Sequence, residues 1–229
     1  MITAILLAAG QGLRLKSTVT PKQFLKVGRK KLYQYSLDTF CNHKRIDEII
    51  LVVNDKLLPQ VQDEIKPWTK RKTIHVIAGG KTRQESSYLG LLYAQLHSKP
   101  DYVMIHDVVR PLITTSLIDT LVVKLKVHAG MTLARHVNDS LFIVDDQATL
   151  ENYVGKQDIY LAQTPQAFHF QTILDAHEHA RKLKIKTASD DASLLTLMGK
   201  KVHVLSGSRL NFKIVTEDDL AVLKKIIAS

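Results

Sequence analysis

Residues 8–14, Ala-Ala-Gly-Gln-Gly-Leu-Arg, have the composition of a loop that could bind phosphate. They follow directly on an apolar run, and glycines at the end of a strand let the backbone approach a phosphate with its N–H groups toward the anion. Two common phosphate loops do not fit. The P-loop needs Gly-Lys-Ser or Gly-Lys-Thr, which this segment lacks, and the dinucleotide-binding fingerprint needs a third glycine where Leu15 stands. The segment therefore offers Gly10 and Gly12 to phosphate in another kind of loop.

Two cations accompany this glycine turn and could lie against the same phosphates. Arg14 closes the turn, and Lys22 comes directly after Pro21. Because proline disfavours helix at its own position and at the one before it, Lys22 is expected in an ordered loop and not on a solvated helix face. The alternative interpretation is a simple strand-to-helix turn with surface cations, since two glycines and an arginine alone are a weak pattern.

Short β-branched runs alternate with amphipathic stretches along the first 130 residues. Strands are predicted at residues 2–7, 48–53, 74–77 and 102–105, and helices at 32–41, 56–66, 83–97 and 116–128. Because these strands are apolar on both faces, the pattern favours an α/β fold with a mostly parallel sheet covered by helices on each side. Ligands of such sheets bind beyond the carboxyl ends of the strands, and the chemistry is expected there.

The rhythm changes after about residue 130. Residues 131–137, 141–144 and 148–154 are short runs broken by polar pairs, which predicts a β-hairpin or arm that projects from the sheet, with its turn at Asp145-Asp146-Gln147. The α/β pattern then resumes, with strands at 159–162 and 202–205 and helices at 170–183, 191–198 and 217–227. We therefore expect a single domain over residues 1–229 with an arm at about 137–157.

Composition narrows the class of protein. Of 229 residues, 45% are hydrophobic and 24% are charged, which excludes disorder as the default state. No apolar run approaches the roughly 20 residues needed to cross a bilayer. The apolar start lacks a basic segment and is predicted as a buried strand and not as a signal peptide. Cys41, the lone cysteine, excludes a disulfide scaffold and fits a cytoplasmic location.

The chain carries a strong excess of positive charge. Lys and Arg number 32 against 22 Asp and Glu, a formal charge of +10. Such an excess attracts polyanions, whether nucleic acid, acidic lipid or phosphorylated metabolites. Aromatic residues are only 6% and the lysines are scattered, so we expect neither a nucleic acid nor a membrane as the partner.

Seven segments together resemble one enzyme family. They fall in the family's order over essentially the whole chain, at residues 8–14, 20–24, 79–86, 106–111, 163–168, 189–193 and 211–216. The chain is similar to 2-C-methyl-D-erythritol 4-phosphate cytidylyltransferases and to their relatives, the ribitol-5-phosphate cytidylyltransferases. The resemblance implies a nucleotide-diphospho-sugar transferase-like fold, transfer of CMP from CTP to a polyol phosphate with release of pyrophosphate, and a homodimer formed through the arm.

The resemblance also implies three sets of site residues. The cations implied to be catalytic are Arg14, Lys22, Lys156 and Lys213. Nucleotide contacts are implied for Ala8, Ala9, Gly10, Gly12, Gly80, Arg83, Ser86, Asp107 and Val108. Acceptor contacts are implied for Asp107, Arg110, Asp139, Ser140, Lys156, Thr164 and Lys213, with the arm residues acting in the partner's site. The implied cofactor is Mg²⁺, held mainly by the CTP phosphates, with a place near Asp107 as one option.

Several of these residues also have a purely structural interpretation. Ser86 could be a helix-surface serine, and Arg110 could tie its loop to a neighbouring carboxylate. Lys213 stands in a strand-like stretch and could be a solvated edge lysine, although it should face away from its apolar neighbours. Asp190 and Asp191 would serve equally well as a helix N-cap.

The implied reaction explains which residue types are present and which are missing. A phosphate monoester is mostly dianionic at pH 7, so its oxygen can attack the α-phosphorus of CTP without a general base. The difficulty is to bring two polyanions together and stabilise the developing charge, which calls for cations and backbone donors. The sequence has no Gly-x-Ser-x-Gly nucleophile elbow, and its ten histidines show no metal-binding spacing.

Two departures from the family pattern keep the acceptor open. Lys156 stands where the family usually has arginine, and Asn138 stands where it has a basic residue. Lysine keeps the charge but loses the bidentate contact with phosphate. Three hypotheses follow: a methylerythritol-phosphate cytidylyltransferase of isoprenoid precursor synthesis, the same chemistry on ribitol 5-phosphate or another polyol phosphate, and a non-catalytic nucleotide- or nucleic-acid-binding module.

Overall fold

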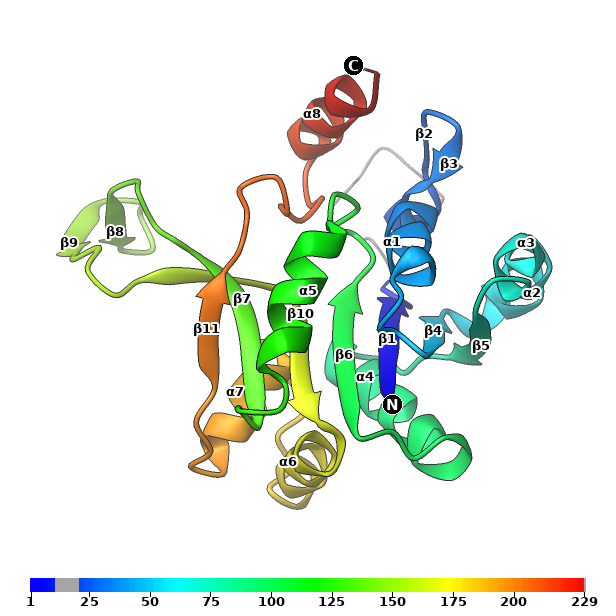
Figure 1. The fold of residues 1–229 in the computed structure, drawn as a ribbon. Coiled ribbons are helices and arrows are strands. Elements are labelled where there is room, and N and C mark those ends of the chain that lie inside the picture. Colours follow the sequence, from blue (N-terminus) through cyan, green and yellow to red (C-terminus); the bar gives the residue numbers. More distant parts are fainter. Residues whose placement is uncertain (11–20, 229) are drawn as a thin grey trace.

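Seven strands form one sheet at the centre of the computed structural model, which describes residues 1–10 and 21–228 (Figure 1). Their order is β11 (His203–Ser206), β7 (Gly130–His136), β10 (Tyr160–His169), β6 (Tyr102–Asp107), β1 (Ile2–Ala8), β4 (Glu48–Val53) and β5 (Thr73–Ala78). β10 pairs antiparallel with both of its neighbours, and the other adjacent pairs are parallel. The predicted mostly parallel α/β sheet is confirmed.

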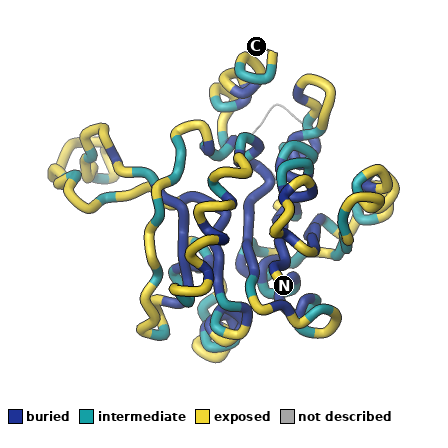
Figure 2. Tube along the Cα trace, viewed as in Figure 1, coloured by how far each residue is buried: buried dark blue, intermediate teal, exposed yellow. Residues whose placement is uncertain are grey.

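Helices cover both faces of the sheet because the strand side chains alternate between two cores. In β1, Ala4 and Leu6 point into one core, and Ile5 and Leu7 point into the other. The first core is closed mainly by α1 (Leu32–Asn42), α2 (Leu58–Glu64) and α5 (Thr115–Lys124). The second is closed by α4 (Arg83–His97), α6 (Phe170–Lys182) and α7 (Asp191–Leu197). Figure 2 shows the central strands buried and the outer helix faces exposed.

A third, smaller core joins the C-terminal helix to the start of the chain. α8 (Glu217–Ala228) packs Leu220 and Leu223 against Val27 of the short ribbon β2 (Lys26–Val27) and β3 (Lys30–Lys31), and against Ile214. Residues 212–215, which precede α8, are thereby held across the end of the sheet. None of the helices in the described residues is both long and apolar enough to span a membrane.

The predicted arm is a hairpin of β8 (Leu141–Val144) and β9 (Leu150–Val154) that projects from the sheet (Figure 1). Asp145 organises its turn, since the carboxylate Oδ1 accepts from the backbone N–H of Gln147 and Thr149 at 2.9 and 2.8 Å. Residues 131–137 were grouped with the two short runs that suggested the arm, and the structure separates residues 131–136 from them. They form β7, which is buried between β10 and β11, because the polar break at Asn138-Asp139 ends a sheet strand and does not begin a hairpin.

Two other predicted elements differ from the structure. The helix expected at 56–66 consists of a 3₁₀ turn (Asp55–Leu57), α2 and α3 (Lys66–Thr69), with a proline in the first turn of each helix. Proline lacks the N–H that would continue a preceding helix, so Pro67 divides the segment. The strand expected at 159–162 runs on to His169 as β10, so that Thr164-Pro165-Gln166 lies within a strand and not after one.

Candidate active site

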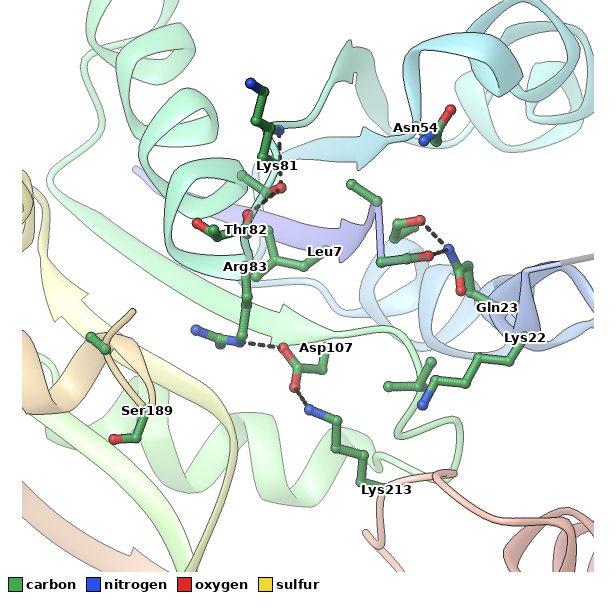
Figure 3. Close-up of a pocket in the computed structure, with 17 residues that line it drawn as sticks. Leu7, Lys22, Gln23, Asn54, Lys81, Thr82, Arg83, Asp107, Ser189 and Lys213 are labelled. Atoms are coloured by element: carbon green, nitrogen blue, oxygen red, sulfur yellow. Dashed lines mark hydrogen bonds and ion pairs between the residues drawn. The ribbon is translucent and has the colours of Figure 1, made fainter. Parts of the chain in front are cut away.

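A cleft of about 490 Å³ opens where β1, β4 and β6 end together. It is lined by nine of the residues implied to bind substrates: Ala8, Ala9, Gly10, Lys22, Gly80, Arg83, Ser86, Asp107 and Lys213 (Figure 3). Gly10 and Lys22 thus reach the same cleft as Asp107 and Lys213. Gly12 and Arg14 fall at positions 11–20, outside the described residues, and their roles stay predictions.

Asp107, the last residue of β6, is the charged centre of the cleft. Its Oδ1 accepts from Arg83 Nε at 2.9 Å, and its Oδ2 accepts from Lys213 Nζ at 2.8 Å (Figure 3). Burial opposes ionisation of Asp107, but the charges of Arg83 and Lys213 outweigh it and hold the pKa of the carboxyl well below its usual range. Two cations are thereby fixed around one carboxylate at the mouth of the sheet.

The loop between β5 and α4 closes one wall of the cleft. Thr82 is the N-cap of α4, with its Oγ1 accepting from the N–H of Glu85 at 3.1 Å. Ser86 donates its hydroxyl to the carbonyl of Thr82 at 2.9 Å and accepts from the N–H of Gly80 at 3.1 Å. Ser86 is 3% exposed, so the interpretation as a helix-surface serine does not hold.

The segment after Pro21 brings two side chains to the opposite wall. Lys22 lines the cleft and donates from Nζ to the carbonyl of Ile214 at 2.7 Å. Its neighbour Gln23 is buried and donates from Nε2 to the carbonyls of Ala8 and Gly10, at 2.7 and 2.6 Å. Gln23 therefore holds the start of the glycine turn in place. Sequence reasoning assigned it no role, although it stands within the recognised Thr-Pro-Lys-Gln-Phe run.

Lys213 does not stand on a strand, contrary to the expectation. Residues 212–215 are irregular, and their backbone is tied to the end of the sheet by the N–H of Ile214, which donates to the carbonyl of Val109 at 2.8 Å. Ile214 and Phe212 pack in the small core under α8. Lys213 consequently faces Asp107, and the predicted orientation opposite its apolar neighbours is found without the predicted strand.

Three further predicted residues do not line the cleft. Thr164 is buried, and its hydroxyl accepts from the backbone N–H of Asp107 at 3.1 Å. Val108 is fully buried, and neither its side chain nor that of Thr164 lines the cleft. Arg110 donates to two carbonyls, those of Asn211 at 2.8 Å and Ala162 at 3.2 Å, and not to a carboxylate. Their contacts with substrate stay predictions.

The arm residues lie elsewhere in the chain. Asp139, Ser140 and Lys156 do not line the cleft of their own chain. Lys156 donates from Nζ to the carbonyl of Asn138 at 3.0 Å, within the arm. The structure thus brings most of the described nucleotide-side residues together with Lys213 and leaves the predicted acceptor-side residues of the arm apart from them.

His106 lies directly beneath Asp107 and is fully buried. Its Nδ1 faces the hydroxyl of Thr164 at 3.1 Å and its Nε2 faces that of Ser36 at 3.2 Å. Burial lowers the pKa of the imidazole to about 3. The ring is therefore neutral and serves as a support for the end of β6.

Neutral burial of His106 predicts an acid-dependent loss of stability. Below about pH 6.5 the unfolded chain binds a proton at this histidine, whereas the folded protein does so only near pH 3. The free energy of unfolding should therefore fall by about 2 kcal/mol between pH 7.5 and pH 5 through this residue alone.

Urea denaturation of the wild type and of His106→Gln at both pH values measures this contribution. The variant should lose less stability on acidification, whereas exposed His97→Gln should behave as the wild type. Equal pH dependence in all three proteins would contradict the buried neutral state.

The chain is similar to known proteins along its whole length. The family model for 2-C-methyl-D-erythritol 4-phosphate cytidylyltransferase matches residues 2–229. The protein of that name from Clostridium botulinum (strain 657) is 32% identical over 225 residues, covering 98% of this chain and 96% of the relative. Ribitol-5-phosphate cytidylyltransferase from Lactiplantibacillus plantarum is 32% identical over 231 residues, covering 99% and 98%. The crystal structure of 4-diphosphocytidyl-2C-methyl-D-erythritol synthase from Anaerococcus prevotii has a TM-score of 0.81 and 29% identity, with 100% of this chain and 98% of that chain covered.

Proposed function

Because the chain belongs to the 2-C-methyl-D-erythritol 4-phosphate cytidylyltransferase family, we propose that its cleft transfers CMP from CTP to the phosphate of 2-C-methyl-D-erythritol 4-phosphate. Pyrophosphate is released, and the product is CDP-methylerythritol, a precursor in isoprenoid synthesis. The observation that carries this assignment is the convergence of Lys22, Arg83 and Lys213 around one cleft at the end of the glycine-bearing first strand.

In this reaction an oxygen of the acceptor phosphate attacks the α-phosphorus of CTP. The new P–O bond forms as the bond to the β-phosphate breaks, and pyrophosphate leaves with its electrons. Since the attacking phosphate is already ionised, no proton has to be removed. The groups that matter are cations held in place before the substrates arrive, because they stabilise charge without reorganising. Lys22 is assigned to the triphosphate, and Lys213 is assigned to the incoming phosphate.

The nucleoside is assigned to the wall made by the loop before α4. Gly80 and Ser86 are small, and the hydroxyl of Ser86 is already used to shape the loop. The cytosine would therefore meet mainly backbone groups of this loop. The backbone of Ala8, Ala9 and Gly10, which also lines the cleft, is placed for the phosphates.

Magnesium fits the cleft as an ion brought by the nucleotide. Within the described residues, no group of three or more His, Cys, Asp or Glu side chains could hold a metal ion. Asp107 is the one acidic residue among those that line the described cleft, and it is already paired. Mg²⁺ is usually held by one or two carboxylates together with substrate phosphates and water. We therefore assign the ion to the CTP phosphates, with Asp107 as the one carboxylate in reach, and its chemistry would be to neutralise phosphate charge.

The arm is proposed to join two chains into a homodimer. Phe142, Ile143, Val144, Leu150 and Tyr153 of the hairpin are about half exposed, which is unusual for apolar side chains gathered on two short strands. A partner chain would bury them and would receive Asp139, Ser140 and Lys156 at its own cleft. Light scattering of the purified protein tests this, since a monomer would overturn the assignment.

Lys156→Ala should separate acceptor binding from nucleotide binding. If Lys156 contacts the acceptor phosphate of the partner's site, its loss removes one charge-assisted contact and raises KM for the polyol phosphate about 10-fold or more. The affinity for CTP should stay near that of the wild type. Lys225→Ala, an exposed lysine on α8, is the matched control. Equal weakening of both ligands would count against the assignment.

We place the enzyme in the cytoplasm, as its unpaired, buried Cys41 and its phosphorylated substrates favour. Its partners are then CTP and a polyol phosphate, with no role for nucleic acid or membrane. The excess positive charge of the chain then serves to attract these small anions.

Pyrophosphate release in the presence of magnesium tests the function. The enzyme is incubated with CTP and, separately, with 2-C-methyl-D-erythritol 4-phosphate, ribitol 5-phosphate and related polyol phosphates. Fastest turnover with methylerythritol phosphate is expected. The similarity to the Lactiplantibacillus enzyme, together with Lys156 and Asn138, makes ribitol 5-phosphate the second candidate. Turnover only with ribitol 5-phosphate would transfer the assignment to that acceptor, and no turnover with any acceptor would favour a binding protein.

A further inference from the structure

Two adjacent aspartates, Asp190 and Asp191, have different surroundings. Asp190 is the N-cap of α7, and its Oδ1 accepts from the N–H of Ser193 at 2.8 Å. Asp191 points the other way, into the protein, and its side chain is 1% exposed. The N-cap interpretation that the sequence left open for both residues therefore holds for Asp190 alone.

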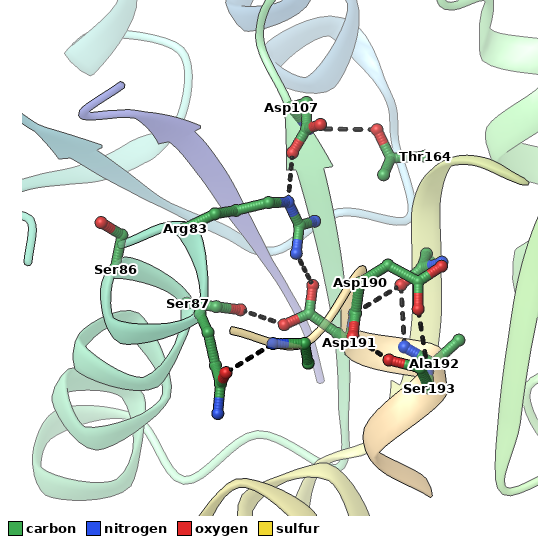
Figure 4. Close-up of polar contacts among 12 residues, drawn as sticks. Arg83, Ser86, Ser87, Asp107, Thr164, Asp190, Asp191, Ala192 and Ser193 are labelled. Carbon is green, nitrogen blue, oxygen red and sulfur yellow. Dashed lines mark hydrogen bonds and ion pairs between the residues drawn. The ribbon is translucent and has the colours of Figure 1, made fainter. Parts of the chain in front are cut away.

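Asp191 is surrounded by hydrogen-bond donors from three other positions. Its Oδ1 accepts from Ser87 Oγ at 2.6 Å and its Oδ2 accepts from Arg83 Nη1 at 2.8 Å (Figure 4). Oδ1 also accepts from His177 Nε2 at 3.0 Å. Burial opposes its ionisation, but the charge of Arg83 outweighs burial and holds the pKa of the carboxyl well below its usual range. Asp191 is thus a paired, buried anion that does not itself line the cleft but contacts Arg83, which does.

Arg83 connects this anion to the cleft. Its Nη1 donates to Asp191 and its Nε donates to Asp107, so that the guanidinium is fixed between two carboxylates (Figure 4). Arg83 is also the first residue of α4, where a positive charge is disfavoured by the helix dipole. Its position therefore depends on the two carboxylates and not on the helix.

Because Asp107 has two cationic partners, it can give up one of them and stay paired. In the free protein Asp107 is paired with both Arg83 and Lys213, whereas Asp191 is paired with Arg83 and also accepts hydrogen bonds from Ser87 and His177. If Lys213 turns to an incoming phosphate, Asp107 keeps Arg83 as its partner. A buried carboxylate left without a partner would be costly, and the fixed guanidinium prevents that.

We propose that Asp191, supported by His177 and Ser87, is a positioning residue that fixes Arg83 and thereby lets Lys213 exchange Asp107 for the acceptor phosphate. This inference rests on the proposed function for the role of Lys213. Without the negative charge of Asp191, Arg83 has Asp107 as its one carboxylate partner, and we expect the guanidinium to bind both oxygens of Asp107. The ammonium of Lys213 is then displaced from Asp107 and no longer held at the cleft.

Asp191→Asn tests this against a matched neighbour. The variant keeps the size of the side chain and removes its charge, and kcat with saturating CTP should fall about 10- to 100-fold, as for a misplaced catalytic group. KM for CTP should change much less. Asp190→Asn makes the same substitution one residue earlier, where asparagine is an equally good N-cap toward Ser193 and only the contact from Gln166 Nε2 at 2.8 Å changes. Its kcat should stay within a few-fold of that of the wild type.

A double-mutant cycle distinguishes positioning from a general structural role. If Asp191 acts through Arg83, adding Asp191→Asn to Arg83→Gln should cost no further activity, whereas independent structural effects would multiply. His177→Gln retains a donor toward Asp191 and should stay near the wild type, while His177→Leu should be impaired. Multiplicative losses in the cycle, or an unimpaired Asp191→Asn, would overturn the proposal.

A spectroscopic readout keeps this test separate from that of the proposed function. The Nε–H of Arg83, which is hydrogen-bonded to Asp107, should give a sharp, slowly exchanging ¹⁵N–¹H signal in the wild type and in Asp190→Asn. In Asp191→Asn it should broaden or shift. An unchanged signal would overturn the fixing of Arg83 by Asp191 even if the enzyme is active. Absence of turnover in the wild type would instead overturn the proposed function.

Discussion

Lys22→Ala is expected to lower kcat about 10²- to 10³-fold, the usual cost of removing one preorganised group that stabilises charge in the transition state. Lys22 lines the cleft from the segment after Pro21, and its Nζ is held by the carbonyl of Ile214 at 2.7 Å. The ammonium is therefore held at the cleft before CTP binds, and the proposed function places it where charge develops on the departing pyrophosphate. Because the contact is made most strongly in the transition state, KM for CTP should change less than kcat.

The control for this variant is Lys26→Ala. Lys26 is four residues further along, is exposed on β2, and does not line the cleft. It should keep near-normal kcat although the net charge of the protein changes equally. Circular dichroism and thermal unfolding check that Lys22→Ala remains folded. A folded Lys22→Ala enzyme with near-normal turnover would refute the role of this lysine.

Much of the fold could be predicted because the strands and helices carry clear periodic patterns. Residues 48–53 and 83–97 have the predicted bounds in the structure, since the apolar run after Glu48 and the capped amphipathic run each end at a polar residue. Apolar residues on both faces of the strands also predicted a sheet with two cores. These features are local, and the sequence shows local features directly.

What could not be predicted depends on contacts between distant segments. Residues 131–137 and 141–144 look alike as short apolar runs, yet the first is buried between β10 and β11 and the second lies in the arm. The antiparallel direction of β10 is likewise set by its neighbours. Lys213 faces Asp107 because Ile214 is anchored to Val109 and packs under α8, and not because of strand periodicity.

In the candidate site, too, part of the arrangement could be predicted from the sequence and part could not. The short motifs predicted that residues from several distant segments meet in one site, and the structure places them at one cleft. Composition or spacing alone would not have predicted this. It did not distinguish residues at the cleft surface from those behind it, such as Thr164 and Val108, because burial is not visible in a motif. Gln23 and Asp191 hydrogen-bond other residues of the site, Gln23 the carbonyls of Ala8 and Gly10 and Asp191 the guanidinium of Arg83, and a motif does not reveal such contacts.

Gly79 is a further position whose importance is visible only in three dimensions. It follows β5, and its N–H donates to the carbonyl of Val53 at 2.7 Å. A Cβ added here would lie 2.4 Å from the Cβ of Ala9 and 2.9 Å from Ser86 Oγ. The loop that closes the nucleotide wall therefore packs directly against the glycine turn, and the absence of a side chain at position 79 permits this contact.

Gly79→Ala should consequently damage both stability and catalysis. The Cβ of Ala9 is bonded to the backbone of the glycine turn and cannot rotate away, so the turn itself has to move. Overpacking of this kind costs about 1–3 kcal/mol in the free energy of unfolding. A displacement of the turn by a fraction of an ångström to an ångström also misplaces the triphosphate relative to Lys22, and kcat/KM for CTP should fall about 10²-fold.

Gly155→Ala supplies the contrast for CTP, because a Cβ added there meets nothing within 4 Å in its own chain and position 155 does not line the cleft. Urea denaturation and steady-state kinetics of the two variants should show losses in Gly79→Ala alone. If Gly79→Ala were destabilised but kept its kcat/KM for CTP, the glycine turn would tolerate displacement and could not be the phosphate-binding element. If both quantities fall together, the packing of the glycine turn against the loop before α4 is part of the nucleotide site, because the substitution introduces no charge and removes no contact with a ligand.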